Sequence, residues 1–313
     1  VLAKVRAVKN RKELLKLMYD LDVKGYGTFP VGFGMTVDAK NSSRYIIGIG
    51  QSGIGLDPEY YTHPNEQQKA VVAAYKSLNN DLLKMVEAAF ALEDRIAKVS
   101  YDQVKSRDPQ ANYHPMTWEQ LLKDYPGIDW NYLLKATGFP DNGGKVDVGQ
   151  PEPVHEVEKI LATAPLESLK AYMELAVVSS AAGMLSDNFT DRKFEYTKVA
   201  YGVQQQQPRW KRALSFVQGI MGEAVGKLYV QKYFPESSKQ RMIALVRNLQ
   251  TAFAQRIEEN TWMTAATKAK ALEKLNAFDI KIGYPDKWQN MDSVFVIDEA
   301  RSLFDNVEGV QEA

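Results

Sequence analysis

Apolar residues recur three or four positions apart along most of this chain, which is the spacing of an α-helix. The most regular series lies between residues 65 and 99 and includes Val71, Val72, Tyr75, Leu78, Leu82, Val86, Phe90 and Leu92. Residues at this spacing share one helix face, so the series predicts a helix with one buried side. Shorter series predict helices at about 11–21, 166–185, 237–259 and 264–275. The pattern therefore predicts a mainly α fold, a lobe built from many amphipathic helices.

A β signal is convincing at one place near the N-terminus. Residues 33–37 and 44–49 alternate as strands do, and the turn-rich sequence 38–43 connects them. We therefore expect one small β-hairpin at about 33–49. A shorter alternation at 278–282 predicts a short strand.

Capping residues mark helix ends in the middle of the chain. Thr117 and Gln120 have the spacing of a capping box, in which each side chain satisfies a free backbone amide of the other residue. Asp129 is placed to cap the next helix, and Gly138 is placed to end it. Gly and Pro are frequent between residues 139 and 154, which predicts a loop. This loop is the best candidate for a mobile connection.

Residues 209–235 carry three glycines along one helical stripe: Gly219, Gly222 and Gly226. Each glycine inside a helix costs about 1 kcal/mol relative to alanine, so three of them require a structural reason. Close packing is the simplest reason, because a stripe without side chains lets another backbone or a large ring approach. We therefore predict a central, buried helix here, stopped by Pro235.

Composition narrows the function classes. The 39 basic and 39 acidic residues balance to a net charge of zero, so the basic face that nucleic-acid binding requires is not indicated. The sequence has no apolar run long enough to span a membrane and no signal peptide at Val1. It begins within a helical pattern and without an initiator Met, so we expect a fragment of a longer protein.

Two motifs suggest chemistry and fail on their details. Gly48, Gly50 and Gly53 match the spacing of a dinucleotide fingerprint after a strand, yet no helix is predicted to open at the last glycine. The expected role is a flexible exit from the hairpin. Ser52, inside this motif, lacks the second glycine of a nucleophile elbow and has no His placed by pattern to activate it.

The second motif, His155-Glu156-Val157-Glu158-Lys159, approaches that of a zinc peptidase helix. Such a helix carries two His four residues apart, with a Glu between them as general base. Here the position of the second His is Lys159, whose ammonium group cannot ligate zinc. His63 and His114 have no partner at ligand spacing. We therefore assign no catalytic and no metal residue to this chain, and its substrate-binding residues remain unknown.

The amino-acid sequences of several segments resemble those of a known family. They are Gln51 to Tyr61, Leu92-Glu93, Arg107-Asp108-Pro109 with Tyr113, Asp129-Trp130, Trp210-Lys211-Arg212, Gly222 to Val230, Phe234-Pro235, Lys270 to Leu275, and Ile282 to Trp288. In this order they resemble the neprilysin and endothelin-converting-enzyme family of zinc endopeptidases, whose bacterial members are PepO-type oligopeptidases. Animal members are held by disulfides, so a chain without cysteine resembles a bacterial member.

The resemblance implies a protein of two interlinked lobes around a chamber. One lobe is catalytic and binds zinc; the other is helical and limits access to the chamber. We expect residues 1–283 to form the helical lobe and 284–313 to lead toward a catalytic lobe outside this chain. The parent would hydrolyse oligopeptides with zinc, and it would be periplasmic, secreted or at the cell surface of a bacterium. This chain would be inactive alone, with the catalytic lobe of the same parent and oligopeptide substrates as partners.

The resemblance leaves some roles open. Neprilysin-like enzymes hold substrate with an Asn-Ala-aromatic segment, but Asn276 stands before the Gly-Tyr-Pro stretch rather than after it, so we expect it only to end a helix. Tyr60, Tyr61, Tyr113 and Trp288 are candidates to line the chamber, although packing is the simpler role. The alternative function is a stand-alone helical interaction module derived from the same lobe, with no protease attached.

Overall fold

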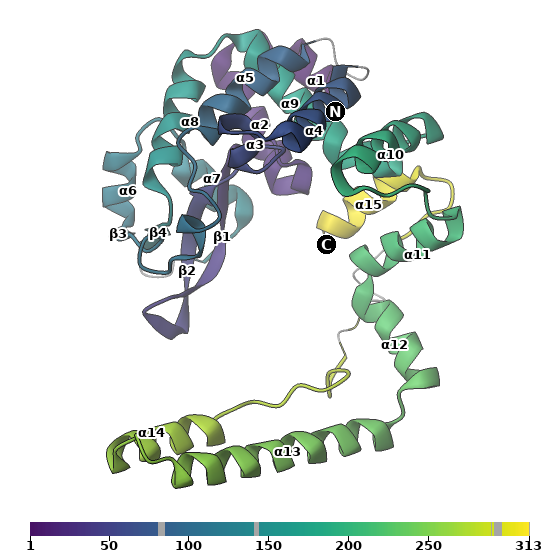
Figure 1. Cartoon of the computed structure of the whole chain (residues 1–313). Coiled ribbons are helices and arrows are strands. Elements are labelled where there is room, and N and C mark those ends of the chain that lie inside the picture. The colour runs from purple at the N-terminus through teal and green to yellow at the C-terminus, as the bar shows by residue number, and fades with distance from the viewer. Residues whose placement is uncertain (81–84, 141–143, 289, 291–295, 313) are drawn as a thin grey trace. The chain divides into compact units, whose positions relative to one another are not determined.

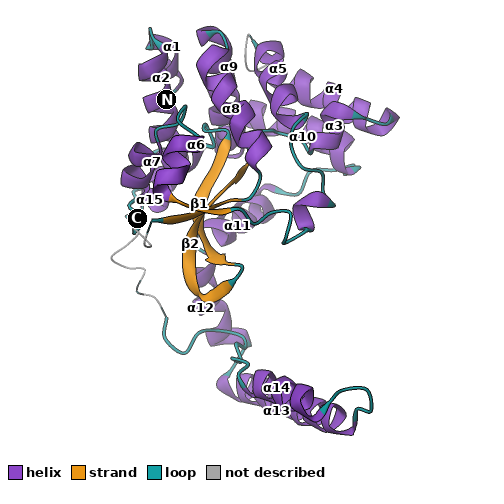
Figure 2. Ribbon diagram, turned by 90° about the vertical axis from the view of Figure 1, so that its left-hand side faces the viewer, coloured by secondary structure: helices purple, strands orange, loops and turns teal. Residues whose placement is uncertain are grey.

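A computed structural model describes the chain at residues 1–80, 85–140, 144–288, 290 and 296–312. These residues form two compact units. The larger unit combines Val1–Gln206 with Ala300–Glu312, and the smaller unit is Gln207–Glu299. Helices predominate throughout, which confirms the mainly α prediction (Figures 1 and 2).

The larger unit is built from short and medium helices around a small sheet. Its helices are α1 (Leu2–Ala7), α2 (Arg11–Leu21), α3 (Pro58–Thr62), α4 (Glu66–Asn80), α5 (Val86–Ala97), α6 (Trp118–Asp124), α7 (Trp130–Thr137), α8 (Pro151–Thr163), α9 (Leu166–Ala181), α10 (Asp187–Tyr201) and α15 (Leu303–Glu312). A π-helical turn, η1 (Asp22–Tyr26), follows α2 directly. The α15 helix packs on this turn, where its Phe304 ring lies 6.0 Å from the ring of Tyr26.

The predicted hairpin is confirmed as strands β1 (Val31–Asp38) and β2 (Asn41–Gln51), which pair antiparallel. Two further strands complete a sheet of order β1-β2-β4-β3. In this sheet β4 (Lys145–Val148) runs parallel to β2 and antiparallel to β3 (Pro115–Thr117).

Two sequence-based assignments of strand and loop are wrong. Residues 139–154 were predicted as a loop, but they include β4 and the start of α8. Val146 and Val148 of β4 are fully buried, so this short segment is anchored by the core and by the edge of β2. No strand forms at 278–282, a stretch that the structure describes completely, and no strand among the described residues lies beside it to pair with it.

The long helix predicted between residues 65 and 99 is two helices. Met85 precedes α5 with φ −132° and ψ 38°, which are not helical angles, and α4 ends at Asn80. The predicted position Leu82 lies outside the described residues. Val71, Tyr75, Val86 and Leu92 are buried as the apolar pattern predicted.

The predicted helix caps are confirmed. Thr117 and Gln120 form both hydrogen bonds of a capping box at α6. The Asp129 side chain accepts a hydrogen bond from the Tyr132 amide at the start of α7. Gly138 ends α7 with φ 65°, a left-handed conformation that glycine adopts without a steric penalty.

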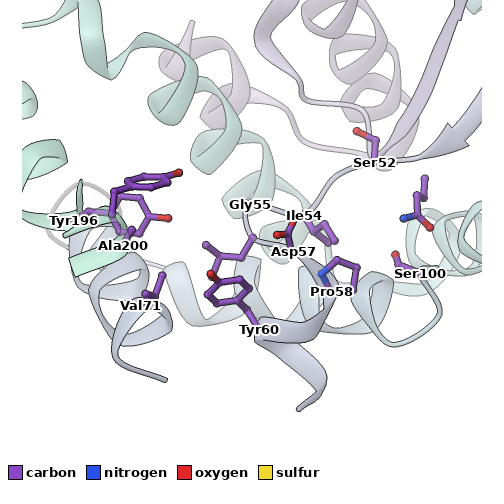
Figure 3. A pocket seen from close by; sticks show the side chains of 13 residues that line it. Ser52, Ile54, Gly55, Asp57, Pro58, Tyr60, Val71, Ser100, Tyr196 and Ala200 are labelled. Carbon is purple, nitrogen blue, oxygen red and sulfur yellow. The ribbon is translucent and has the colours of Figure 1, made fainter. Parts of the chain in front are cut away.

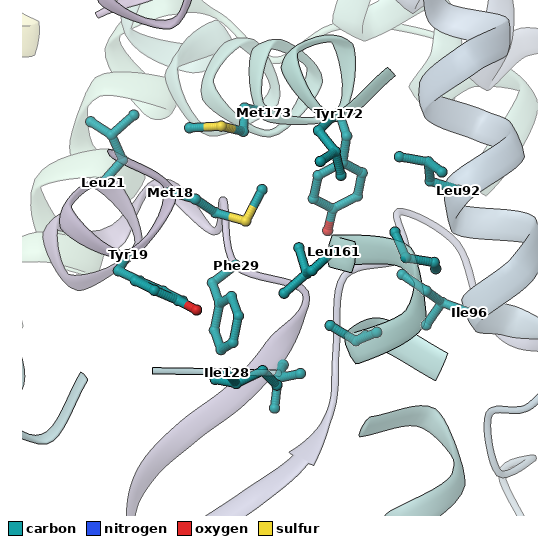
Figure 4. Close-up of a cluster of buried hydrophobic side chains, with 14 of the residues drawn as sticks. Met18, Tyr19, Leu21, Phe29, Leu92, Ile96, Ile128, Leu161, Tyr172 and Met173 are labelled. Atoms are coloured by element: carbon teal, nitrogen blue, oxygen red, sulfur yellow. The ribbon is translucent and has the colours of Figure 1, made fainter. Parts of the chain in front are cut away.

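One hydrophobic core fills the larger unit (Figure 4). It joins Met18 and Tyr19 of α2 to residues of three later helices, among them Ile96, Leu161 and Met173. These side chains are almost completely buried, and apolar burial is the main stabilising contribution to a fold of this kind. Ile54 and Leu56 of the loop after β2 pack against this core, and a pocket opens beside that loop.

The described part of the smaller unit contains four helices: α11 (Arg209–Ile220), α12 (Gly222–Tyr233), α13 (Glu236–Glu259) and α14 (Ala265–Asn276). The α13 and α14 helices lie side by side (Figures 1 and 2). Asn276 ends α14, as predicted. The ammonium group of Lys239 on α13 donates to the carbonyl of Tyr284 at 2.9 Å, which holds the Gly-Tyr-Pro stretch against this helix.

The prediction of one central buried helix at 209–235 is wrong for the described chain. Met221, with φ −123° and ψ 38°, separates α11 from α12. None of the described residues in these two helices is buried. A side chain placed at Gly219, Gly222 or Gly226 would meet no atom within 4 Å. The stripe without side chains is present, but nothing in the described residues packs into it.

Candidate functional site

The motif that approaches a zinc peptidase helix, residues 155–159, lies on the first turns of α8. Its charged side chains form ion pairs. His155 stacks on the ring of Tyr125 with a centroid distance of 4.3 Å, and its Nδ1 lies 3.2 Å from Glu158. The guanidinium of Arg95 donates to Glu156 at 2.7 Å. Lys159 lies 3.6 Å from the same carboxylate. These cationic neighbours make this helix face a poor ligand set for a metal cation.

The glycine motif is part of the sheet. Gly48 and Gly50 lie in β2, where they pair with Gly34 and Gly32 of β1. Gly53 has φ 83° and is packed against Pro30 and the Tyr172 hydroxyl. The next helix, α3, begins at Pro58 instead of at the last glycine. The motif therefore lacks the helix N-terminus that binds a pyrophosphate, as the sequence predicted.

A pocket of about 410 Å³ opens beside the chain that leaves β2 (Figure 3). Its wall is formed by the segment from Gln51 to Pro58, by α3 and α4, and by α10. In Figure 3, Tyr196 and Ala200 stand on one side, Ser52 and Ser100 on the other, and Asp57 and Tyr60 between them. Its size is within the range of small-molecule sites.

A buried carboxylate lies directly behind this wall. Glu93 of α5 is only 3% exposed. It accepts hydrogen bonds from the Tyr61 hydroxyl at 2.8 Å and from the Tyr75 hydroxyl at 2.9 Å, and from the Gly55 amide. The Tyr172 hydroxyl donates to the Gly53 carbonyl at 3.0 Å. We name Glu93, Tyr61, Tyr75 and Tyr172 the Glu93 cluster; it fixes the backbone of the pocket wall.

Burial raises the pKa of Glu93 to about 7, even though the three hydrogen bonds that it accepts favour the ionised form. In the same cluster, burial and the nearby Glu93 charge raise the pKa values of Tyr61 and Tyr75. Both phenols therefore remain protonated donors. The cluster titrates through its carboxylate, near neutral pH.

We expect the larger unit to lose stability as the pH rises through this range. The pKa of Glu93 is about 7 in the folded chain against an ordinary value of 4.5, so folding takes up a proton between these values. The stabilising contribution is complete below pH 4.5 and is lost as the pH rises through 7. The free energy of unfolding should fall by about 3 kcal/mol across this window. Denaturant titrations between pH 4 and 8 measure it.

Glu93→Gln is the control for this pH dependence. Glutamine keeps the size and the acceptor oxygen but does not titrate. The free energy of unfolding of this variant should therefore fall by about 3 kcal/mol less over the same pH range. Asp22, whose pKa burial raises to about 6, contributes in the same direction in both proteins. Parallel profiles for the two proteins would show that Glu93 is not the group responsible.

The four aromatic residues predicted as candidates to line the chamber lie at different places in the structure. Tyr60 lines the pocket, and Tyr61 belongs to the Glu93 cluster, where it stacks on Phe90. The Tyr113 hydroxyl donates to Asp38 at 2.8 Å. Trp288, in the smaller unit, stacks on Tyr284. Their role toward a substrate stays a prediction.

Sequence reasoning singled out the segment from Gln51 to Tyr61 but did not predict a pocket there. It gave no role to Asp57, and it missed Tyr196, which reaches the pocket from a helix far along the chain. The signal that was available is Glu93. It lies on the same helix as Ala89, Leu92 and Ile96, all of them buried, so an acid at this position indicates a hydrogen-bonded carboxylate in the core.

Among the described residues, no group of three or more His, Asp or Glu side chains is arranged to hold a metal ion. In the same residues, no helix combines the length and the apolar character needed to cross a bilayer.

Comparison with known proteins places these observations in a family. Residues 1–285 match the profile of Peptidase family M13. A neutral endopeptidase of Lactobacillus helveticus is 27% identical over 288 residues, which cover 88% of this chain and 44% of that protein. Endothelin-converting enzyme-like 1 of mouse is 31% identical over 296 residues, which cover 88% of this chain and 37% of the enzyme.

A solved structure gives the same result. The zinc metalloprotease Zmp1 of Mycobacterium tuberculosis, in complex with an inhibitor, superposes with a TM-score of 0.87 at 34% identity. The match covers 99% of this chain and 48% of that one. The chain therefore spans less than half the length of each of these relatives.

Proposed function

Because this chain belongs to peptidase family M13, we propose that it is the access-limiting helical lobe of a bacterial neprilysin-like zinc endopeptidase. The parent protein would hydrolyse oligopeptides. The observation that carries this proposal is the extent of the match: nearly the whole chain superposes on less than half of a zinc metalloprotease. No group of three or more His, Asp or Glu side chains that could hold a metal lies among the described residues, which supports zinc ligands elsewhere in the parent.

The zinc chemistry is assigned to the parent because the donor set of this chain does not fit the metal. The α8 helix presents one His, with Lys159 at the position of the second, and Arg95 pairs with the Glu between them. No step of peptide hydrolysis is therefore assigned to these residues. The contribution of the lobe would be size selection and closure around the substrate.

Exposed apolar residues on the smaller unit are evidence for a partner lobe. Met242, Leu245, Leu249 and Phe253 follow one face of α13, and each is at least 41% exposed. An apolar stripe of this length on a soluble protein usually marks an interaction site. The glycine stripe of α11 and α12 is equally uncovered. We propose that the catalytic lobe of the same parent covers both surfaces, and that the parent acts in the periplasm, as a secreted protein or at the cell surface.

A paired assay tests this function. Zinc content by elemental analysis and cleavage of a fluorogenic peptide are measured on this chain and on the longest natural form of the protein. We expect the short chain to be metal-free and inert, and the long form to bind one zinc and cut the peptide. A long form without zinc or cleavage would favour the alternative, a stand-alone interaction module. Stoichiometric zinc or cleavage with the short chain would contradict the assignment of the zinc site.

We also expect this chain alone to self-associate through the α13 stripe. Leu249→Asp combined with Phe253→Asp places two charges in the stripe and should reduce association by at least a hundredfold, since burying an unpaired charge costs several kcal/mol. Light scattering over a concentration series measures the association. Thr251→Asp combined with Gln255→Asp adds the same charges on the other side of α13 and should leave it unchanged. A strict monomer at high concentration would contradict the expectation.

A further inference from the structure

Asp57 is the acidic residue of the pocket wall, and its carboxylate is not used for helix capping. It occupies the N-cap position of α3, where an Asp side chain normally accepts a hydrogen bond from the helix backbone. Here the side chain makes no capping bond. Its Oδ2 accepts a hydrogen bond from the Gln103 side chain at 3.3 Å. The residue is exposed and lines the pocket, so the carboxylate has further acceptor sites for a ligand.

Three tyrosine side chains surround the same space. Tyr60 comes from α3, whereas Tyr196 and Tyr201 come from α10. All three line the pocket, and burial and the nearby phenols of Tyr201 and Tyr60 raise the pKa of Tyr196. The Tyr196 ring is held in place by an edge contact with Tyr75 of the Glu93 cluster, at a centroid distance of 6.2 Å. The aromatic wall therefore rests on the same buried scaffold as the loop that carries Asp57.

The charge of the pocket has one sign. Of the described residues that line it, Asp57 is acidic and none is Lys, Arg or His. The other polar groups are hydroxyls and the Gln51 amide, and the Gln51 side chain is already paired with the backbone of Tyr101 through both of its polar atoms. An anion would meet an uncompensated carboxylate here. A cation would meet the carboxylate and the electron-rich faces of aromatic rings.

We propose that this pocket binds an organic cation, a guanidinium or ammonium group carried on a short aliphatic arm. The carboxylate of Asp57 would accept hydrogen bonds from the cationic head, and Tyr60 and Tyr196 would pack against the head and the arm. The pocket of about 410 Å³ is large enough for one side chain of this kind. Two sources share this chemistry: an arginine or lysine side chain of a peptide, and a free amine. The proposal is independent of the proposed function, because binding requires no peptidase activity.

Calorimetric titration of the longest natural form with two matched probes tests the proposal. The probes are N-acetyl-arginine amide and N-acetyl-citrulline amide, which have nearly the same shape and differ in charge. We expect the arginine probe to bind roughly tenfold more tightly, because it alone offers a cationic head to the Asp57 carboxylate and to the tyrosine rings. Asp57→Asn should reduce this preference to about twofold, and Tyr196→Leu should reduce it as well. Asp124→Asn, which removes a charge from the exposed end of α6, is the control and should retain it.

The outcomes separate clearly. Equal binding of both probes, or no binding of either, overturns the proposal. Tight binding of the arginine probe that survives Asp57→Asn also overturns it, because the site then lies elsewhere. A third titration with n-butylguanidine, which has the same arm and the same single charge without the peptide groups, distinguishes the sources. Butylguanidine binding as tightly as the arginine probe indicates a small free cation, and weaker binding indicates a peptide side chain.

Discussion

Gly55→Ala is expected to lower the free energy of unfolding of the larger unit by roughly 3 to 5 kcal/mol. A methyl group at this position would lie 2.6 Å from Cζ and 2.9 Å from Cε2 of the Tyr75 ring. Tyr75 is buried and its hydroxyl is bound to Glu93, so the ring cannot move aside without breaking that hydrogen bond. The cost combines an overpacked core with a buried carboxylate that loses a donor. Denaturant unfolding at pH 6 measures it.

Gly34→Ala is the matched control, since a methyl group there would meet no atom within 4 Å. It should change stability by no more than about 0.5 kcal/mol. The Gly55 variant should also lose the binding of the arginine probe, because Gly55 is part of the pocket wall. Equal stability of the two variants would mean that the Glu93 cluster is looser than the structure indicates.

Trp130→Ala is expected to have a comparable effect, a loss of roughly 3 to 5 kcal/mol. Trp130 is completely buried, and its ring stacks on Phe33 of β1 at a centroid distance of 6.1 Å. Its Nε1 donates to the Tyr125 carbonyl at 2.8 Å, so truncation leaves both a cavity and a buried carbonyl without its donor. The melting temperature should fall by about 10 °C, which calorimetry measures.

Trp118→Ala removes the same bulk from a half-buried position, where the indole Nε1 donates to Asn131 at the surface. The expected loss is smaller, about 1 to 2 kcal/mol. A Trp130 variant no less stable than the Trp118 variant would contradict the packing described for α7.

Features set by neighbouring residues could be predicted from the sequence. The alternation in residues 33–37 and 44–49 indicated the hairpin, and the capping box of Thr117 and Gln120 indicated the start of α6. Each depends on residues a few positions apart, whose geometry is fixed by the backbone itself. The apolar spacing of α4 and α5 predicted their buried faces for the same reason.

Features set by distant residues could not be predicted in this way. The β4 strand has only four residues, and it forms because β2 offers an edge about 100 positions earlier in the chain. The pocket combines Asp57 with Tyr196, which no local pattern connects. The glycine stripe at 219–226 was read as buried because glycine inside a helix implies a close neighbour. The described residues do not contain that neighbour.

The position of α15 has a consequence for the order of folding. Tyr26, near the start of the chain, donates a hydrogen bond to Glu308, which is 282 positions later, and Val307 is buried in the larger unit. During synthesis the larger unit therefore has most of its core but lacks this last helix until the whole smaller unit has left the ribosome. Closing so long a loop is slow compared with forming local contacts. Nascent chains arrested before residue 300 should expose the surface of η1 to chaperones, and extension past residue 312 should conceal it.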